Sequence, residues 1–175
     1  MKNVLWFVMD IDGTLTDGTL EYSSDGVDRK RFHAADGLGI VMARACGFRI
    51  AAISGRTSPS AHKRLTDLKV DRIFEGIGDK ALVLRVLLND EGLAPDQVAY
   101  IGDDINDLPA FDVAGVRFAV GDASEILKRK ADHVTVRNGG RGAVREAIES
   151  ILSAQGRLDE AVEAYLSASR VGPRQ

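Results

Sequence analysis

Two aspartates stand two positions apart near the start of the chain, in the run Asp10-Ile11-Asp12-Gly13-Thr14. The residues directly before them are continuously apolar, which is typical of a strand buried on both faces. Like charges in one small pocket repel each other, so a cation lies between them or one of them is protonated. Mg²⁺ favours oxygen ligands of this kind. Asp10 can then attack phosphorus, and Asp12 can act as general acid and afterwards as general base.

A second acidic cluster, Gly102-Asp103-Asp104-Ile105-Asn106-Asp107, follows another apolar run. Several acids crowded against a buried strand are costly unless they bind a cation. Asp103 is the expected direct metal ligand. Asp104 and Asp107 are expected to support that site or to cap a helix.

A hydroxyl and two basic side chains complete the set that can do chemistry. Ser54 ends a third apolar run, and its side chain and backbone can donate to a phosphate oxygen. Arg56 can add a bidentate contact. Lys80 stands where a helix is expected to begin, so its ammonium can reach a phosphate or Asp10. Alone, a Ser-Gly pair is also a common turn, and a lysine at a helix start is usually solvated. The two acidic clusters are the reason to expect a functional role for Ser54 and Lys80.

The elements that must position these residues alternate along the chain. Six runs are expected as strands: 4–9, 49–53, 72–74, 97–101, 116–120 and 133–136. Helical patterns lie between and after them: 37–46, 58–68, 80–91, 108–114 and 141–152. This alternation predicts an α/β fold, a doubly wound parallel sheet of Rossmann-like type in one domain spanning residues 1–175. Ligands bind at the carboxyl ends of such strands, so the three polar run-ends are expected along one edge.

Two segments stand outside the alternation. Residues 17–33 contain Ser23-Ser24-Asp25-Gly26 between two extended-looking runs, which predicts a small β-hairpin inserted after the first strand. Residues 153–175 form a C-terminal tail with a possible helix and a frayed end.

The composition of the chain argues against several classes of protein. The chain has 175 residues, 28% of them charged, and a formal net charge of -3. That balance favours neither nucleic acid nor an anionic membrane as a partner. The single cysteine, Cys46, excludes an intramolecular disulfide and is expected as a small buried hydrophobe. Acids directly after the first apolar run fit neither a signal peptide nor a membrane span, so a cytoplasmic protein is expected.

The chain resembles phosphatases of the haloacid dehalogenase superfamily, because it carries four motifs in their order and spacing. These motifs are Asp10-x-Asp12-Gly13-Thr14, Ser54-Gly55-Arg56, Lys80, and Gly102-Asp103-Asp104-x-x-Asp107-Leu108. The early hairpin, the run 35–40 and the phrases at 138–146 and 154–161 are similar to 3-deoxy-D-manno-octulosonate 8-phosphate phosphatases. The resemblance implies a Mg²⁺-dependent enzyme of lipopolysaccharide biosynthesis that forms an aspartyl-phosphate. It covers the chain from about Val4 to Ala161.

The same resemblance implies roles for particular residues. Asp10 would be the nucleophile and Asp12 the acid/base, while Ser54 and Lys80 would hold the phosphoryl group. Asp10, Asp103 and the main-chain carbonyl of Asp12 would bind the metal. The substrate side would be lined by a further set of residues: His33, Ala34, Ala35, Asp36, Gly37, Arg56, Arg64 and Asp104.

One departure leaves the substrate open. Val41 stands where octulosonate 8-phosphate phosphatases typically carry an arginine. A nonulosonate (sialic-acid type) 9-phosphate is therefore the alternative substrate. The alternative without catalysis is a receiver-like phosphoacceptor domain, disfavoured because receivers carry the phosphoacceptor after the third strand.

Assembly is the last expectation. The insert is too small to cover its own site, and the loops after the later strands are short, so a neighbouring subunit is the expected roof. The resemblance implies a homotetramer. The tail, with Arg157, or the loop at Arg141 would then approach an adjacent site.

Overall fold

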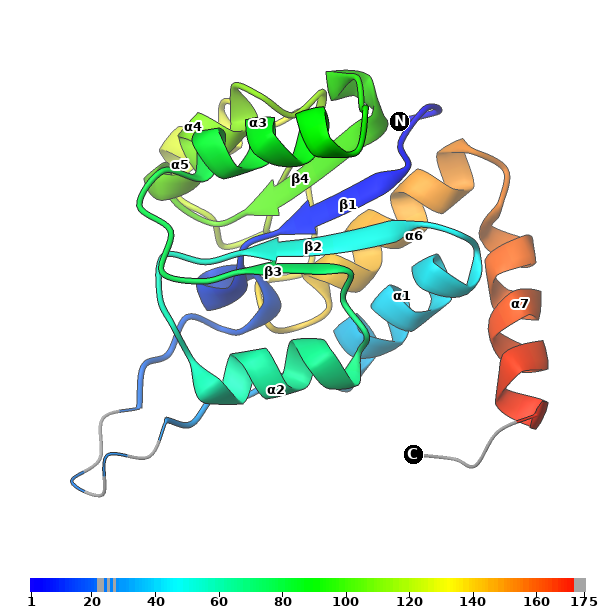
Figure 1. The fold of residues 1–175 in the computed structure, drawn as a ribbon, viewed down its shortest axis with the longest axis horizontal. Coiled ribbons are helices and arrows are strands. Elements are labelled where there is room, and N and C mark those ends of the chain that lie inside the picture. The colour runs from blue at the N-terminus through cyan, green and yellow to red at the C-terminus, as the bar shows by residue number, and fades with distance from the viewer. Residues whose placement is uncertain (22–23, 25, 27, 172–175) are drawn as a thin grey trace.

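The computed structural model describes residues 1–21, 24, 26 and 28–171. Its centre is a six-stranded, all-parallel sheet with the strand order β3-β2-β1-β4-β5-β6 (Figure 1). The strands are β1 (Trp6–Met9), β2 (Arg49–Ile53), β3 (Arg72–Phe74), β4 (Val98–Gly102), β5 (Val116–Ala119) and β6 (His133–Val134). The predicted doubly wound parallel sheet is confirmed.

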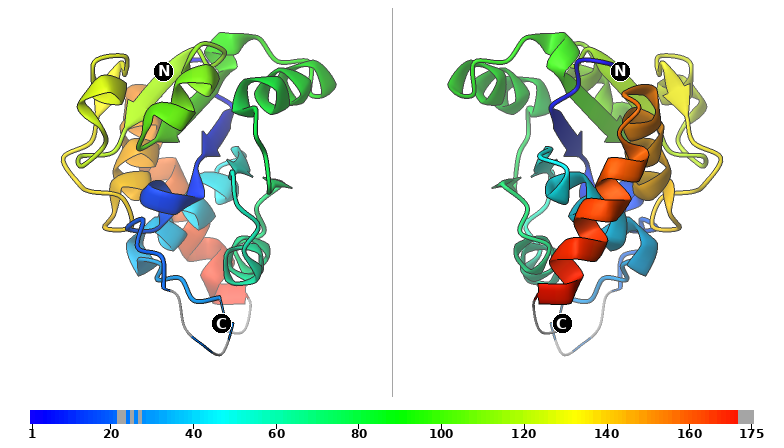
Figure 2. Two further views of the ribbon diagram at one scale, coloured as in Figure 1. Left: turned by 90° about the vertical axis from the view of Figure 1, so that its left-hand side faces the viewer. Right: turned by 90° about the vertical axis from the view of Figure 1, so that its right-hand side faces the viewer.

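Helices cover both faces of this sheet (Figures 1 and 2). One face carries α1 (Ala34–Ala45), α2 (Pro59–Asp67), α6 (Ala143–Ala154) and α7 (Leu158–Val171), and the other carries α3 (Lys80–Asp90), α4 (Leu108–Phe111) and α5 (Glu125–Lys128). Three short turns complete the described elements: η1 (Ile11–Leu15), η2 (Pro95–Gln97) and η3 (Ile105–Asp107). The reversal of strand order between β1 and β4 creates a switch point, where such sheets bind their ligands.

The core explains why the central strands form. All residues of β1 and β4 are buried, because helices cover both of their faces. Cys46 is buried at 5% exposure, as expected of a small hydrophobe. None of the described helices is long and apolar enough to cross a membrane.

The elements that differ from the sequence-based expectation are mostly short ones. α1 begins at Ala34 rather than near residue 37, because the His33 side chain accepts a hydrogen bond from the Ala35 N–H and caps the helix earlier. The short helix α5, capped by Ser124, was not anticipated. Four residues are too few for a periodic pattern to show.

The arm, residues 17–33, leaves the sheet edge after η1 and returns to α1 (Figure 1). Its described residues belong to no strand. The predicted turn falls partly on residues 22, 23, 25 and 27, which lie outside the described residues, so the hairpin stays a prediction.

The C-terminal segment is a helix through Val171 that packs along α1 and α6. Ala161 on α7 is fully buried. Arg157 donates to the Cys46 carbonyl at 2.6 Å and pairs with Glu160. The possible tail helix is therefore confirmed, and it lies at the opposite end of the sheet from the carboxyl ends of the strands (Figure 1).

Candidate active site

The sheet register brings three predicted site residues to one edge. Met9, the last residue of β1, is paired with Ala52 of β2 and with Ile101 of β4. Asp10, Ser54 and Asp103 therefore follow neighbouring strands at their carboxyl ends, as the sequence predicts. The Asp10 N–H extends the ladder by donating to the Ile101 carbonyl at 3.0 Å.

The chain turns sharply immediately after Asp10. Gly13 has a φ of +88°, a conformation that favours glycine. A Cβ at this position would also lie 2.1 Å from Asp103 Oδ2. Glycine therefore allows the turn and lets the Asp103 carboxylate approach the backbone of residues 10–14, the catalytic loop, named for the two predicted catalytic acids that it carries.

Lys80 joins this edge from the start of α3. Its ammonium donates to Asp10 Oδ1 at 2.8 Å and to Asp107 Oδ1 at 2.6 Å. All three side chains are buried, with at most 3% exposed. The predicted contact between Lys80 and Asp10 is present.

Asp107 supports the site from η3. Its Oδ1 also accepts from the Tyr100 hydroxyl at 2.7 Å, and its Oδ2 accepts from the Asp103 N–H at 2.9 Å. A Cβ at Gly102 would lie 2.2 Å from Asp107 Oδ2, so only glycine leaves room for this contact. Because both of its oxygens have protein donors, Asp107 positions Lys80 and the Asp103 backbone.

The electrostatics of the edge follow from burial and crowding. Burial, together with the charge of Asp107, raises the pKa of Asp10 to about 6 despite the opposing effect of Lys80. Burial and the charges of Asp10 and Asp107 raise the pKa of Asp103 to about 8. Burial alone would lower the pKa of Lys80, but the two carboxylates raise it, so the lysine is a cation. One lysine does not neutralise three carboxylates.

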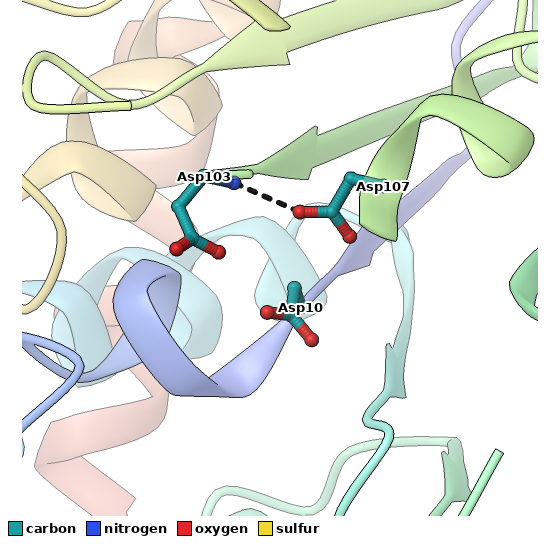
Figure 3. Close-up of side chains that lie close together, drawn as sticks. All are labelled: Asp10, Asp103 and Asp107. Atoms are coloured by element: carbon teal, nitrogen blue, oxygen red, sulfur yellow. Dashed lines mark hydrogen bonds between the residues drawn. The ribbon is translucent and has the colours of Figure 1, made fainter. Parts of the chain in front are cut away.

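The acids can hold a metal ion. Figure 3 shows the carboxylates of Asp10, Asp103 and Asp107 converging on one space, and one ligand atom from each lies within 4.8 Å of the others. An all-oxygen, acidic donor set suits Mg²⁺. The residues present therefore fit a divalent cation, with Asp10 and Asp103 as the carboxylates whose oxygens are less committed to protein donors.

An open pocket of about 310 Å³ lies beside this cluster. It is lined by Gly13, Asp17, Gly18, Thr19, Asp103 and Asp122. Its wall is braced by the loop before α6: a Cβ on Gly139 would lie 1.7 Å from the Gly13 carbonyl oxygen, and Gly140 donates its N–H to the Thr14 carbonyl at 2.9 Å. The loop before α6 was expected as a turn into that helix, and its glycines also pack against the catalytic loop.

Ser54 lies at the edge as predicted and is buried. Its Oγ accepts from the Arg56 N–H at 3.1 Å, while its carbonyl accepts from the Ile77 N–H at 3.0 Å. The hydroxyl hydrogen keeps its capacity to donate, as a phosphate oxygen requires. Arg56 is exposed, and its predicted contact with the substrate stays a prediction.

Among the residues expected on the substrate side, Asp36 is fully buried and already engaged. Its two oxygens accept from the N–H groups of Gly142 and Arg145, each at 3.0 Å, which caps α6 from α1. Burial nevertheless raises its pKa. In the structure Asp36 links α1 to α6, and its role in substrate binding stays a prediction.

The remaining substrate-side residues lie in two places. His33, Ala34 and Ala35 form the start of α1, and Gly37 lies against the guanidinium of Arg64 on α2, where a Cβ would meet Arg64 at 2.3 Å. Two of the predicted substrate-side residues, Gly37 and Arg64, therefore lie next to each other. Asp104 is exposed and caps η3 through the Ile105 N–H at 2.8 Å, in agreement with its expected capping role.

Two residues of the site were not anticipated. Tyr100 is fully buried in β4, and a phenol in a strand covered on both faces needs a hydrogen-bond partner, which was the available signal. Lys30 of the arm forms an ion pair with Asp12 Oδ1. No sequence signal marked Lys30, because its neighbours Arg29 and Arg31 are equally basic.

The chain is similar to proteins of known family. Residues 69–148 match the haloacid dehalogenase-like hydrolase family. The chain is 43% identical over 157 residues to the 3-deoxy-D-manno-octulosonate 8-phosphate phosphatase of Haemophilus influenzae, covering 90% of this chain and 87% of that protein. The corresponding enzyme of Escherichia coli K12 is 38% identical over 160 residues, covering 91% and 85%.

Solved structures are also similar. A 3-deoxy-D-manno-octulosonate 8-phosphate phosphatase from Moraxella catarrhalis, in complex with magnesium ion, phosphate ion and KDO, superimposes with a TM-score of 0.90 at 37% identity and 94% coverage of both chains. A probable YrbI family phosphatase from Pseudomonas syringae gives a TM-score of 0.90 at 42% identity, again with 94% coverage of both chains.

The fold is that of a haloacid dehalogenase-like hydrolase. The identity across nearly the whole chain is more specific. The chain belongs to the haloacid dehalogenase superfamily of phosphatases and resembles 3-deoxy-D-manno-octulosonate 8-phosphate phosphatases.

Proposed function

We propose that this enzyme is a Mg²⁺-dependent phosphomonoesterase that hydrolyses 3-deoxy-D-manno-octulosonate 8-phosphate through an aspartyl-phosphate on Asp10. The observation that carries the proposal is the buried Asp10 carboxylate, held at 2.8 Å by Lys80 Nζ among acids that can bind one cation. The relatives from Haemophilus influenzae and Escherichia coli, named for this activity, support the choice of substrate.

The chain's own residues provide each chemical role. An Asp10 oxygen attacks phosphorus while the ester P–O bond breaks, and the leaving alkoxide takes a proton from the Asp12 carboxyl group. Lys80 and Ser54 stabilise the negative charge on the phosphoryl oxygens. Asp12, now a carboxylate, takes a proton from water, which attacks phosphorus and releases phosphate from Asp10.

Mg²⁺ is the cofactor that the acidic edge fits. Asp10, Asp103 and the main-chain carbonyl of Asp12 would hold it. When bound, it neutralises charge on the phosphate and on the crowded carboxylates. Asp107 keeps the geometry by fixing Lys80 and the Asp103 backbone.

The choice between two sugar acid phosphates depends on the substrate side. Val41 on α1 is 37% exposed, so it presents an aliphatic surface where an arginine would present a cation. A nonulosonate 9-phosphate is the second candidate on that observation. Phosphate release from both compounds at matched concentrations tests the proposal. We expect a higher kcat/KM for the octulosonate ester, and a preference for the nonulosonate ester would overturn it.

We also infer that the active form is a homotetramer. No described segment outside the arm is inserted as a cap over the pocket beside Asp103. A partner subunit would then exclude water from that site. Sedimentation should give four chains per particle. A fully active monomer would contradict the inference.

A further inference from the structure

Lys30, in the part of the arm that returns to α1, contacts the catalytic loop at Asp12. Its ammonium forms a hydrogen-bonded ion pair with Asp12 Oδ1. The Lys30 side chain is 5% exposed and that of Asp12 is 21% exposed, whereas the flanking residues Arg29 and Arg31 are exposed. A lysine withdrawn from water in an exposed segment gives up its hydration for this carboxylate.

A second contact fixes the arm two residues earlier. Asp28 Oδ2 accepts from Ser58 Oγ at 2.7 Å, from the Ser60 N–H at 2.9 Å and from Ser60 Oγ at 2.6 Å. These hydrogen bonds lower the pKa of Asp28, so it is a carboxylate at neutral pH. Ser58 in turn caps α2 through the Ala61 N–H at 3.1 Å. The returning half of the arm is therefore anchored to α2, and this anchor holds the chain where Lys30 reaches Asp12.

We propose that Lys30 is a positioning residue for the acid/base Asp12. A carboxylate on a solvent-facing turn samples several rotamers. With Oδ1 held by Lys30, the other oxygen is the one that carries the proton to the leaving group. The arm thus contributes a residue to the catalytic machinery within its own chain. This inference rests on the proposed function of Asp12.

The leaving group separates this role from a structural one. A sugar alkoxide is a strong base, so breaking its P–O bond needs the proton from Asp12 as the bond breaks. A p-nitrophenolate is a weak base and leaves without that proton. Because kcat/KM reports the steps through the first irreversible one, it isolates phosphoryl transfer to Asp10 from the later attack of water. Loss of Lys30 should therefore damage the reaction of a sugar phosphate more than that of p-nitrophenyl phosphate.

The test compares Lys30→Met with the wild type on octulosonate 8-phosphate and on p-nitrophenyl phosphate, in excess Mg²⁺. We expect kcat/KM for the sugar phosphate to fall about 30-fold, and that for the aryl phosphate to fall less than about threefold. Lys30→Arg should recover most of the loss because a guanidinium can still donate to Asp12. Lys63→Met is the matched control, since Lys63 on α2 is 77% exposed and pairs only with Asp67 among the described residues.

Asp28→Asn provides a second route if Lys30→Met does not fold. It weakens the anchor without touching Asp12, and it should shift the ratio of the two substrates in the same direction by a smaller factor. Equal losses on both substrates, or no loss on either, would overturn the role of Lys30. A wild-type protein that hydrolyses neither ester would instead overturn the proposed function, so the two failures are distinguishable.

Discussion

At the scale of residues, the carboxylates of the site differ in how many of their oxygens accept hydrogen bonds from protein donors. Asp107 has protein donors on both oxygens, Asp10 has Lys80 on one, and Asp12 has Lys30 on one. A carboxylate that is fully occupied supports its neighbours, whereas one with a free oxygen can react or bind a metal. This difference separates the positioning acid from the reacting ones.

Removing the proposed nucleophile tests the role of Asp10. Asp10→Asn keeps the shape of the side chain but removes the attacking charge. We expect kcat to fall by at least about four orders of magnitude, with an unchanged circular dichroism spectrum. Asp12→Asn should be nearly as damaging on a sugar phosphate. A substantial residual kcat in Asp10→Asn, after contaminating phosphatase is excluded, would reject the mechanism.

Binding of Mg²⁺ should depend on pH. The pKa values of Asp10 and Asp103 are raised to about 6 and about 8, so in the metal-free protein their protonation stabilises the fold. That contribution is complete below the unfolded value of 3.8 and is lost as pH rises through the folded values. Mg²⁺ competes with these protons.

The expected result is that Mg²⁺ raises the melting temperature more at about pH 8.5 than at about pH 5.5, and that calorimetry detects proton release on binding. Asp103→Asn should reduce both effects. A Mg²⁺-induced shift that is the same at both pH values would contradict the raised pKa of these acids.

Most of the residue-scale chemistry could be predicted from the sequence. Asp10, Ser54, Lys80 and Asp103 directly follow apolar runs or open a helix, and the rule that parallel strands end at one edge brings them together. Lys30 could not be found in this way. Its contact with Asp12 depends on the path of an irregular arm, for which side-chain periodicity gives no signal.

At the scale of elements, the edge of the sheet that carries the proposed catalytic acids (the catalytic edge) is braced by the junction of α1 and α6. Asp36 of α1 accepts from two N–H groups at the start of α6, and the loop leading into α6 contacts the catalytic loop at Gly13. The sequence showed both helices but could not show that Asp36 joins them, because the two segments are about a hundred residues apart.

Asp36→Ala distinguishes this link from a role in substrate binding. The change leaves two buried N–H groups without an acceptor, so we expect a loss of about 2 kcal/mol in the free energy of unfolding, measured in urea. The KM of the folded fraction should stay within about twofold of the wild type. A large rise in KM with unchanged stability would instead assign Asp36 to the substrate.

At the scale of the whole molecule, α7 completes the domain at the end of the sheet opposite the catalytic edge (Figure 1). Within one chain it cannot cover the site, so any effect of this helix on catalysis has to come through its own packing or through another subunit. The sequence indicated a possible helix here, but packing on α1 is a long-range contact that local patterns do not encode.

A charge on the buried side of α7 tests this packing. Ala161 is 0% exposed, so Ala161→Asp buries a carboxylate and should lower the melting temperature by about 10 °C. Leu166→Ala is the control, because Leu166 is 48% exposed on the same helix. Equal melting temperatures for Ala161→Asp and the wild type would show that α7 does not stabilise the domain.

The central claim is that Asp10 carries the phosphoryl group during turnover. The most direct measurement follows the label of a phosphate-labelled sugar acid ester, in acid-quenched protein digested to peptides. We predict label on the peptide that contains Asp10, released by hydroxylamine as expected of an acyl phosphate, and absent from Asp10→Asn. Label on a serine, histidine or other residue would contradict the account. So would the absence of label on Asp10 in Asp12→Asn treated with phosphate-labelled p-nitrophenyl phosphate, because that leaving group needs no proton whereas hydrolysis of the intermediate still needs Asp12.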